Sequence, residues 1–233
     1  MKTLLFTPLH PLYGILPETL ASLTAVAQSC PDVHVMLWGS QRQYNNPNLD
    51  ENANNNQDIR DKYNIGRAVA LSQGFEAMLT IEADMIVPPD ALSRLIALDA
   101  DIALGVYCWR WRPSRWSAYT ELNQWGGKSV TFDPAFAVRS WGKPVDAVGT
   151  GLGCTLIKRR VLEALPFRLF DGDPRHLGIV ASDWALSCDA QQAGYRQRAD
   201  LGLVCGHVDL SKRVVYWPDP IQPEFYKGVS YGN

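Results

Sequence analysis

The 233-residue sequence lacks several features that would assign it to common protein classes. No apolar run is long enough to cross a bilayer, and the short apolar run at the N-terminus stops at Pro8, too early for a signal peptide. The formal net charge of -2 argues against a dedicated nucleic-acid binder, while leaving local basic patches open. The five cysteines form no C-x-x-C pair, so we expect reduced, buried thiols and a cytoplasmic location.

The apolar pattern predicts one α/β domain, because 46% hydrophobic content is enough for a full core. A strand at 4–7, a helix at 16–28 and a strand at 33–38 form a β-α-β unit, which implies parallel pairing. Further predicted helices cover 58–73, 90–98, 159–165 and 182–193, and further strands cover 77–81, 102–107, 145–148, 153–157 and 202–205. We expect an Asn-rich surface loop at 41–57, an irregular middle at 109–141, and a tail without periodicity after a last strand at 202–205.

Two carboxylates follow the predicted strand at 77–81. Glu82 and Asp84 are separated by Ala83 and therefore point to the same side of an extended chain. Two oxygen donors on one side suit Mg2+ or Mn2+, which also bind the oxygens of a substrate phosphate. The alternative is an acidic turn between a strand and a helix that Asp90 caps.

A histidine follows the predicted strand at 202–205 and could supply a third ligand. His207 comes directly after Gly206, and a neutral imidazole binds Mn2+ acceptably. The alternative is a surface or hydrogen-bonded histidine. We interpret the three other histidines as structural: His10, His34 and His176.

One acidic residue in the C-terminal half of the chain is a candidate general base. Asp183 follows Ser182 at the start of a predicted helix, after a loop at 171–179. In one interpretation it only stabilises the start of the helix. In the other it takes the proton of an acceptor hydroxyl. Asp189 on the same helix is expected to be solvated. The glycines of the segment 149–153 lack the dinucleotide-binding spacing, but they would let a substrate lie against the backbone or simply form a turn.

Aromatic residues and arginines alternate between 107 and 125. Such side chains stack on sugar rings or bases and pair with phosphates, although core packing is the alternative for any single ring. The residues are Trp109, Arg110, Trp111, Arg112, Arg115, Trp116, Tyr119 and Trp125.

The order of these motifs resembles the nucleotide-sugar-dependent glycosyltransferases of the GT-A fold, in the group of the small family-two enzymes. The resemblance covers residues 4–209 and rests on the β-α-β opening, the segment 64–68, Glu82-Ala83-Asp84, the segment 149–151, Ser182-Asp183 and His207. It implies a Rossmann-like domain over 1–233, with a mostly parallel central sheet flanked by helices. Residues 1–105 would bind the nucleotide, 106–210 the donor sugar and acceptor, and 211–233 would form a lid.

The resemblance also implies roles for individual residues. Asp84 and His207 would hold Mn2+ or Mg2+, and Asp183 would be the catalytic base of an inverting member. The nucleotide would contact Thr7, Pro8, Ser40, Arg67, Glu82 and Ala83. The donor sugar or acceptor would contact Gly151, Trp109 and Trp184, while Lys212 and Arg213 would close over the diphosphate.

Three positions depart from the usual pattern of the group. Glu82 stands where an aspartate is common, Trp38-Gly39-Ser40 replaces a base-reading aspartate, and Ser182 precedes Asp183 where a glutamate is common.

The expected function is metal-dependent transfer of a sugar from a nucleotide-diphosphate sugar to a hydroxyl of a glycan, protein, lipid or modified nucleic acid. The alternatives are a nucleotidyltransferase that makes a sugar nucleotide and a non-catalytic module that binds glycan or nucleic acid through the Trp/Arg segment.

Overall fold

A central seven-stranded sheet organises the chain. The computed structural model describes residues 1–39, 51–123, 126–170 and 182–232, with the backbone alone at 51–53. The strand order is β2-β1-β3-β10-β5-β11-β8. Pairing is parallel between β1 and both β2 and β3, and between β5 and β11, whereas β10 and β8 run antiparallel to their neighbours. The strands are β1 Thr3–Pro8, β2 Val33–Trp38, β3 Ala77–Ile81, β5 Ile102–Val106, β8 Pro144–Ala147, β10 Cys154–Lys158 and β11 Gln197–Val204.

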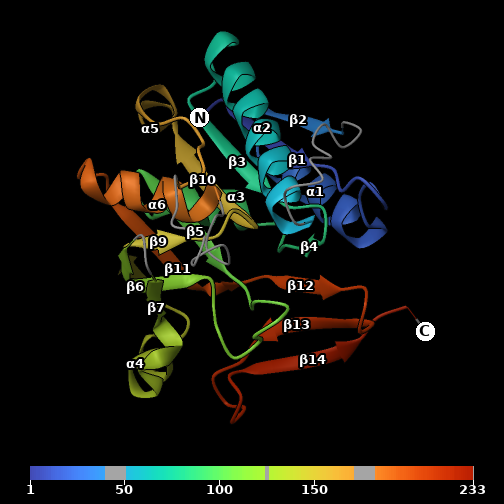
Figure 1. Cartoon of the computed structure of the whole chain (residues 1–233), viewed down its shortest axis with the longest axis vertical. Helices are drawn as coiled ribbons and strands as arrows, with labels where there is room; N and C mark the ends of the chain where they lie inside the picture. The colour runs from blue at the N-terminus through green and yellow to red at the C-terminus, as the bar shows by residue number, and fades with distance from the viewer. Residues whose placement is uncertain (40–50, 124–125, 171–181, 233) are drawn as a thin grey trace.

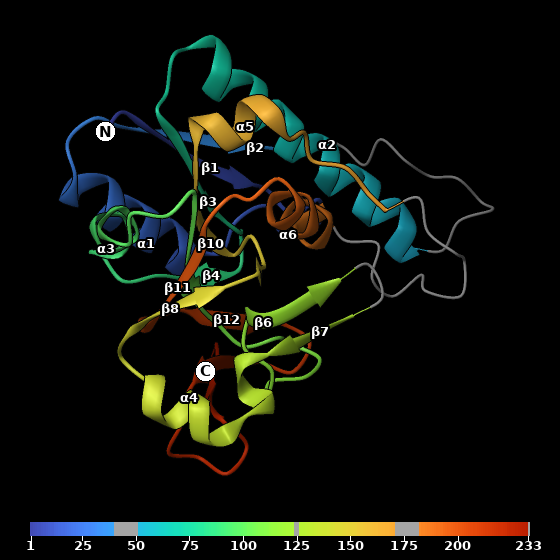
Figure 2. The same ribbon diagram turned by 90° about the vertical axis from the view of Figure 1, so that its left-hand side faces the viewer.

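Helices cover both faces of this sheet, which confirms the predicted Rossmann-like α/β class. Helices α1 (Pro17–Ser29) and α3 (Ala91–Ala97) lie on one face, and α2 (Glu51–Ser72), α5 (Arg159–Ala164) and α6 (Ser182–Gln192) lie on the other (Figures 1 and 2). Alternate residues of β1 point to the two cores: Leu5 packs with the α1 and α3 side, while Leu4 and Phe6 pack with the α2 side. Every residue of β1, β3 and β5 is buried, as expected for central strands covered on both faces.

The tail is more regular than predicted. Strands β12 (Gly206–Asp209), β13 (Val214–Pro218) and β14 (Tyr226–Ser230) form a second sheet with β4 (Met85–Ile86) in the order β14-β13-β12-β4. The prediction of a last strand at 202–205 and an irregular tail was therefore wrong. Antiparallel pairing through short turns supplies the order, and Pro218 is tolerated because it ends a strand.

The middle segment is also more regular than predicted. Strands β6 (Ala118–Asn123), β7 (Gly126–Ser129) and β9 (Gly149–Thr150) form a third sheet, and the 3-10 helix η1 (Val130–Phe132) and helix α4 (Pro134–Ser140) follow β7. The Asp133 side chain caps α4 by accepting from the Phe136 backbone N–H at 3.0 Å. The mixed aromatic, arginine, glycine and proline residues of this segment show no strand or helix periodicity in the sequence. Trp116 is wholly buried and belongs to a core.

Two local predictions near α2 and α3 need correction. Helix α2 begins at Glu51, so residues 51–57 are helical and not part of a loop. Tertiary packing overrides the poor helix propensity of asparagine here, since Asn54 and Asp58 are one turn apart and both are buried. Asp90 stands at the N-cap of α3 without a side-chain capping bond and instead lies 4.0 Å from Arg94. Residues 41–50, 125 and 171–181 of the predicted loops and aromatic segment lie outside the described residues.

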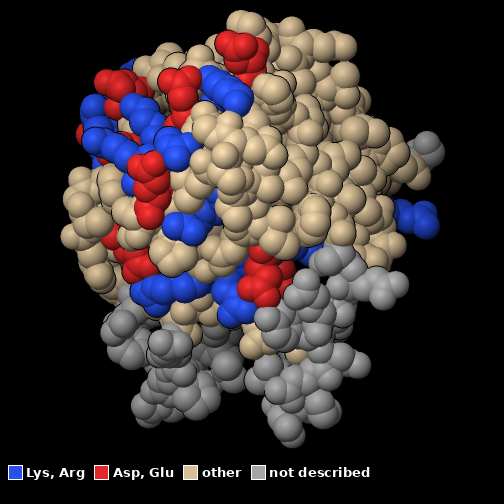
Figure 3. Space-filling model, turned by 90° about the horizontal axis from the view of Figure 1, so that it is seen from above, with Lys and Arg blue, Asp and Glu red and all other residues tan. Residues whose placement is uncertain are grey.

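The described part of the face of the molecule in Figure 3 has no extended basic patch. Charged side chains of both signs are intermixed there. All five cysteines are free, and all but Cys30 are buried. Among the described residues, no helix is long and apolar enough to cross a membrane.

Candidate active site

Pairing between the two short strands β4 and β12 brings the predicted metal ligands together. In the antiparallel register His207 stands opposite Met85, and the Val208 backbone N–H donates to the Asp84 carbonyl at 3.0 Å. One ligand atom from each of Glu82, Asp84 and His207 lies within 4.8 Å of the other two. These residues follow the carboxyl ends of β3 and β11, the edge at which open α/β sheets bind ligands. We call them the acidic cluster.

The histidine of the acidic cluster is oriented as a metal ligand. Its Nδ1 lies 2.8 Å from the Cys108 carbonyl, and this bond requires a proton on Nδ1, so that the neutral form of the ring carries its lone pair on Nε2. The buried Nε2 has no hydrogen-bond partner among the described residues, and it faces Asp84 Oδ1 at 3.7 Å. Neighbouring ligands of a six-coordinate Mg2+ are about 3 Å apart and opposite ones about 4.2 Å, so this spacing fits a shared divalent cation.

The second oxygen of Asp84 has other partners. Arg110 Nη1 lies 2.8 Å from Asp84 Oδ2, and the Tyr13 hydroxyl donates to the same oxygen at 3.4 Å. Burial raises the pKa of Asp84, but His207 and Arg110 outweigh that effect and lower the pKa to about 2. Asp84 is therefore ionised at neutral pH, with Oδ1 left for the side of His207.

Glu82 is held differently from Asp84. Its Oε1 accepts from the Tyr63 hydroxyl at 3.0 Å. Burial and the neighbouring Asp84 carboxylate raise the pKa of Glu82. Two neighbouring acids whose environments shift their pKa values in opposite directions are typical of functional sites.

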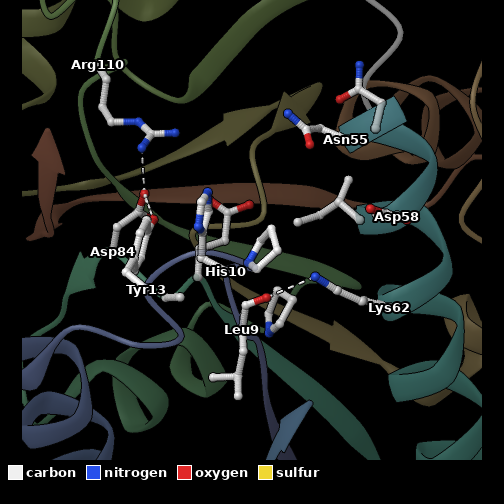
Figure 4. Close-up of a pocket in the computed structure, with 14 residues that line it drawn as sticks. Leu9, His10, Tyr13, Asn55, Asp58, Lys62, Asp84 and Arg110 are labelled. Atoms are coloured by element: carbon white, nitrogen blue, oxygen red, sulfur yellow. Dashed lines mark hydrogen bonds and ion pairs between the residues drawn. The ribbon is translucent and has the colours of Figure 1, made fainter. Parts of the chain in front are cut away.

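A cavity of about 230 Å³ opens on one side of the acidic cluster, between the end of β1 and the N-terminal half of α2. Figure 4 shows Asn55, Asp58 and Lys62 projecting from α2 toward Asp84 and Arg110. The predicted nucleotide contacts Pro8, Glu82 and Ala83 line this cavity. The prediction of a loop at 41–57 missed Asn55 as a helical residue, whereas Asp58 and Lys62 lay on the predicted helix at 58–73 without an assigned role.

Two basic side chains of this cavity were also missed. Lys62 is buried and donates to the Leu9 carbonyl at 2.9 Å, and burial lowers its pKa. His10, predicted to be structural, lines the cavity with its ring stacked on Tyr13 at a centroid distance of 3.9 Å. The only sequence signal for Lys62 was its place one turn after Asp58 on the predicted helix.

A second cavity of about 420 Å³ opens on the other side and shares Glu82 and Arg110 with the first. Its lining brings together four predicted site residues from three separate segments of the chain: Trp109, Gly151, Asp183 and Trp184. His207 also lines it. The candidate base therefore faces the same space as two members of the acidic cluster, Glu82 and His207.

Asp183 lies in the first turn of α6, where its Oδ1 accepts from the Trp184 backbone N–H at 2.7 Å. Burial raises its pKa to about 6, although the backbone hydrogen bonds act in the opposite direction. A carboxylate with this pKa is a suitable proton acceptor near neutral pH. Asp189 is not solvated as predicted, since it forms an ion pair with Arg168 at 2.6 Å.

Tyr107 connects the acidic cluster with Asp183. Its ring packs edge-on against His207 at 5.3 Å, and its hydroxyl accepts from the Gly153 backbone N–H at 3.3 Å. A Cβ at Gly151 would lie 1.8 Å from the Tyr107 hydroxyl oxygen and 3.5 Å from Asp183 Oδ2. Only glycine therefore allows the backbone to pass at this point.

We expect Gly151→Ala to lower the free energy of unfolding by about 1–3 kcal/mol, because the new methyl group overpacks a buried site. In Gly151→Ala/Tyr107→Phe the nearest atom becomes the ring carbon Cζ at 3.0 Å, so most of the loss should be recovered. Urea denaturation of the two single variants and the double variant measures this coupling. An equal cost of Gly151→Ala with and without the tyrosine hydroxyl would contradict the assignment.

Two of the predicted nucleotide contacts, Arg67 and Thr7, do not line either cavity. Arg67 Nε donates to the Leu162 carbonyl at 2.5 Å and its Nη2 to the Glu163 carbonyl at 3.3 Å, so the guanidinium closes the end of α5 instead of reaching the cavity. Thr7 is wholly buried in β1 and lines neither cavity. Ser40 lies outside the described residues.

The two predicted diphosphate contacts lie beside the site and line neither cavity. Lys212 Nζ pairs with Asp209 Oδ2 at 3.1 Å and donates to the Arg110 carbonyl at 3.2 Å. Arg213 is exposed at the turn between β12 and β13. Arg110, which sequence reasoning assigned only to the aromatic segment, is the arginine that contacts the acidic cluster. No local signal could have selected it among the neighbouring arginines.

Comparisons with known proteins support the fold. The sequence matches no protein-family model and no curated protein. Among solved structures, A197 from STIV has a TM-score of 0.61 over 100% of this chain and 95% of its own, at 16% identity. This likeness shows a shared fold across the whole chain.

Two other solved structures overlap less well. TarS 1-349 of S. aureus in complex with UDP has a TM-score of 0.46 at 15% identity, over 85% of this chain and 57% of its own. The inositol-1-phosphate CTP transferase from T. maritima has a TM-score of 0.45 at 13% identity, over 90% of this chain and 89% of its own.

Proposed function

We propose that the protein is a glycosyltransferase that uses a divalent cation and a nucleotide-diphosphate sugar. The observation that carries this proposal is the position of the acidic cluster, which lies where the 230 Å³ and 420 Å³ cavities adjoin. A donor has two parts that need separate sites, a nucleotide and a sugar, joined by a diphosphate that a cation neutralises. The cluster and the two cavities match these three requirements.

In this proposal Asp84 and His207 hold the cation, and Glu82 completes the site directly or through water. Bound Mn2+ or Mg2+ would neutralise the charge that develops on the departing diphosphate. The nucleotide occupies the smaller cavity, where Lys62 and the polar side chains of α2 surround it. Arg110, half exposed beside Asp84, is placed to donate to a phosphate oxygen.

The chemical step takes place in the larger cavity. Asp183 removes the proton from an acceptor hydroxyl, the hydroxyl oxygen forms a bond to the anomeric carbon, and the bond from that carbon to the diphosphate breaks. One base acting in one displacement inverts the configuration of the anomeric carbon. Tyr107 packs against His207, and Gly151 lies beside Tyr107 and Asp183, so these two residues help to place Asp183 and His207 in the same cavity.

The experiment is a product assay with the full chain, Mn2+ or Mg2+, and a panel of nucleotide sugars. We expect release of a nucleoside diphosphate from at least one donor, lost on chelation of the metal with EDTA and restored by its addition. A nucleotidyltransferase would instead release pyrophosphate from a nucleoside triphosphate and a sugar phosphate. If neither the nucleotide sugars nor nucleoside triphosphates with sugar phosphates give a metal-dependent product, the proposal is contradicted and a non-catalytic module is favoured.

A further inference from the structure

Four aromatic side chains line one side of the 420 Å³ cavity, and we call them the aromatic wall: Trp109, Trp111, Tyr119 and Trp184. Their rings contact one another in sequence. Ring centroids are 4.9 Å apart for Trp109 and Trp111, 6.0 Å for Trp109 and Tyr119, and 5.1 Å for Tyr119 and Trp184. The wall is thus a continuous surface built from the segment after β5, from β6 and from α6.

Most of the aromatic wall is fixed before any ligand arrives. Tyr119 is buried, and Trp184 Nε1 donates to the Asn123 carbonyl at 2.8 Å. Trp109 is partly buried between its two aromatic neighbours. A rigid surface loses little conformational entropy on binding, which favours affinity.

Trp111 is the exception, because it is 66% exposed. An exposed indole lacks the favourable free energy that burial of its large apolar surface normally provides. An exposed tryptophan at the edge of a cavity is therefore suited to contact a ligand. The Arg112 guanidinium lies 5.0 Å from the Trp111 ring centroid and offers N–H donors beside it. Flat apolar surface next to hydrogen-bond donors suits the face and the hydroxyl groups of a sugar ring.

Charge distinguishes a glycan from a nucleic acid at this surface. The cavity floor carries Glu82 and Asp183, two acids that would repel a phosphate backbone. Arg110 is already paired with Asp84, which leaves Arg112 as the arginine of the lining without a described acidic partner. Binding of a single strand needs a groove of several cations, so this lining favours an uncharged ligand.

We propose that the aromatic wall binds a neutral glycan, with one pyranose ring stacked on Trp111 and a hydroxyl directed to Asp183. This inference rests on the proposed function, since it names the acceptor of that reaction. Trp111 would position the acceptor and contribute to specificity without taking part in bond formation.

The test measures glycan binding alone, without nucleotide or metal. The full chain is applied to an array of neutral glycans covering common hexoses, pentoses and N-acetylhexosamines, and the affinity of the strongest binder is measured by titration calorimetry. The single-stranded oligonucleotide dT12 is titrated in parallel. We expect binding of at least one neutral glycan, no binding of dT12, and about tenfold or greater loss of glycan affinity in Trp111→Ala.

Phe132→Ala is the matched control for Trp111→Ala. Phe132 is also exposed, at 51%, and lies under the Arg115 guanidinium, but it does not line the cavity. Its removal should leave glycan affinity unchanged. Equal effects of the two substitutions would show that loss of an exposed ring, and not loss of this site, explains the result.

Other outcomes overturn the inference in separate ways. Binding of dT12 that is lost in Trp111→Ala would assign the wall to nucleic acid, and the absence of any neutral binder on the array would reject a glycan. Failure of the proposed function appears elsewhere: glycan binding would persist while no nucleotide sugar is turned over. Turnover of a donor to its free sugar without any glycan binding would reject the acceptor alone.

Discussion

Replacing Asp84 by asparagine should lower kcat/KM for sugar transfer by about a thousandfold or more, because the cation that stabilises the leaving diphosphate loses its charged ligand. The substitution keeps the shape of the side chain. Arg110 loses its partner, but its side chain is 47% exposed and can be hydrated. Folding should therefore survive, and steady-state kinetics at several Mn2+ concentrations would show the loss.

Asp200→Asn is the matched control for this change. Asp200 is also a buried acid in a 2.8 Å ion pair with an arginine, Arg94, and it lines neither cavity. Its substitution should reduce stability and leave the kinetic constants of the folded enzyme close to wild type. Equal losses of activity in the two variants would mean that Asp84 acts only through the stability of the fold.

Replacing Asp183 by asparagine should lower kcat by about 100- to 10,000-fold, the usual contribution of a general base. Nucleotide affinity should be unchanged, since Asp183 lines only the larger cavity. Asp189→Asn on the same helix removes an ion pair outside the cavity and serves as control. Weakened nucleotide binding in Asp183→Asn, with kcat preserved, would contradict the assignment.

The pH dependence follows from the raised pKa of Asp183, about 6. A base must be unprotonated, and kcat/KM reports the pKa of the free enzyme, so kcat/KM should rise with pH up to about 6 and level off above it. The contribution of Asp183 to the free energy of unfolding changes with pH in the opposite direction. A carboxyl whose pKa is raised by folding stabilises the folded state below its unfolded pKa. This contribution is lost as the pH rises through about 6. Asp183→Asn should therefore raise the melting temperature more at pH 7.5 than at pH 4, measured by thermal denaturation; an equal change at both values would contradict the shift.

The acidic cluster could be predicted from sequence because each ligand follows the end of an apolar strand. The prediction relied on alternation along an extended chain, whereas residues 83–84 form a turn between β3 and β4; the edge of the sheet is nevertheless where the two carboxylates and His207 meet. The close approach of the Asp84 and His207 side chains depends on the pairing of strand β4 with strand β12, and each of these strands is only a few residues long. Strands this short have no periodicity to detect.

Arg110 and Lys62 show why other parts of the site could not be predicted. Arg110 reaches Asp84 from the segment after β5, and its neighbour Arg112 has the same local surroundings in the sequence. Lys62 was correctly placed on a helix, but its position in the 230 Å³ cavity depends on the packing of α2 beside the end of β1, where it donates to the Leu9 carbonyl. Long-range contacts decide both cases, whereas local propensity is only a weak guide.

The regular α/β core was predicted well for a related reason. Central strands such as β3 are continuous apolar runs bounded by turn residues, which local patterns describe. The second and third sheets were missed because their strands are short, carry exposed residues and contain proline, glycine or aromatic side chains.

In the proposed function, Glu82, Asp84 and His207 bind a nucleoside diphosphate through a divalent cation. The most direct measurement is the melting temperature of the full chain with UDP, GDP, ADP and CDP, each with and without Mn2+, for the wild-type protein and for Asp84→Asn. A ligand present at 100 times its Kd stabilises by about 2.7 kcal/mol, which would be a shift of several degrees. We predict such a shift for at least one nucleotide, only with Mn2+ and only in the wild-type protein; no shift with any nucleotide, or the same shift without Mn2+ or in Asp84→Asn, would contradict the claim.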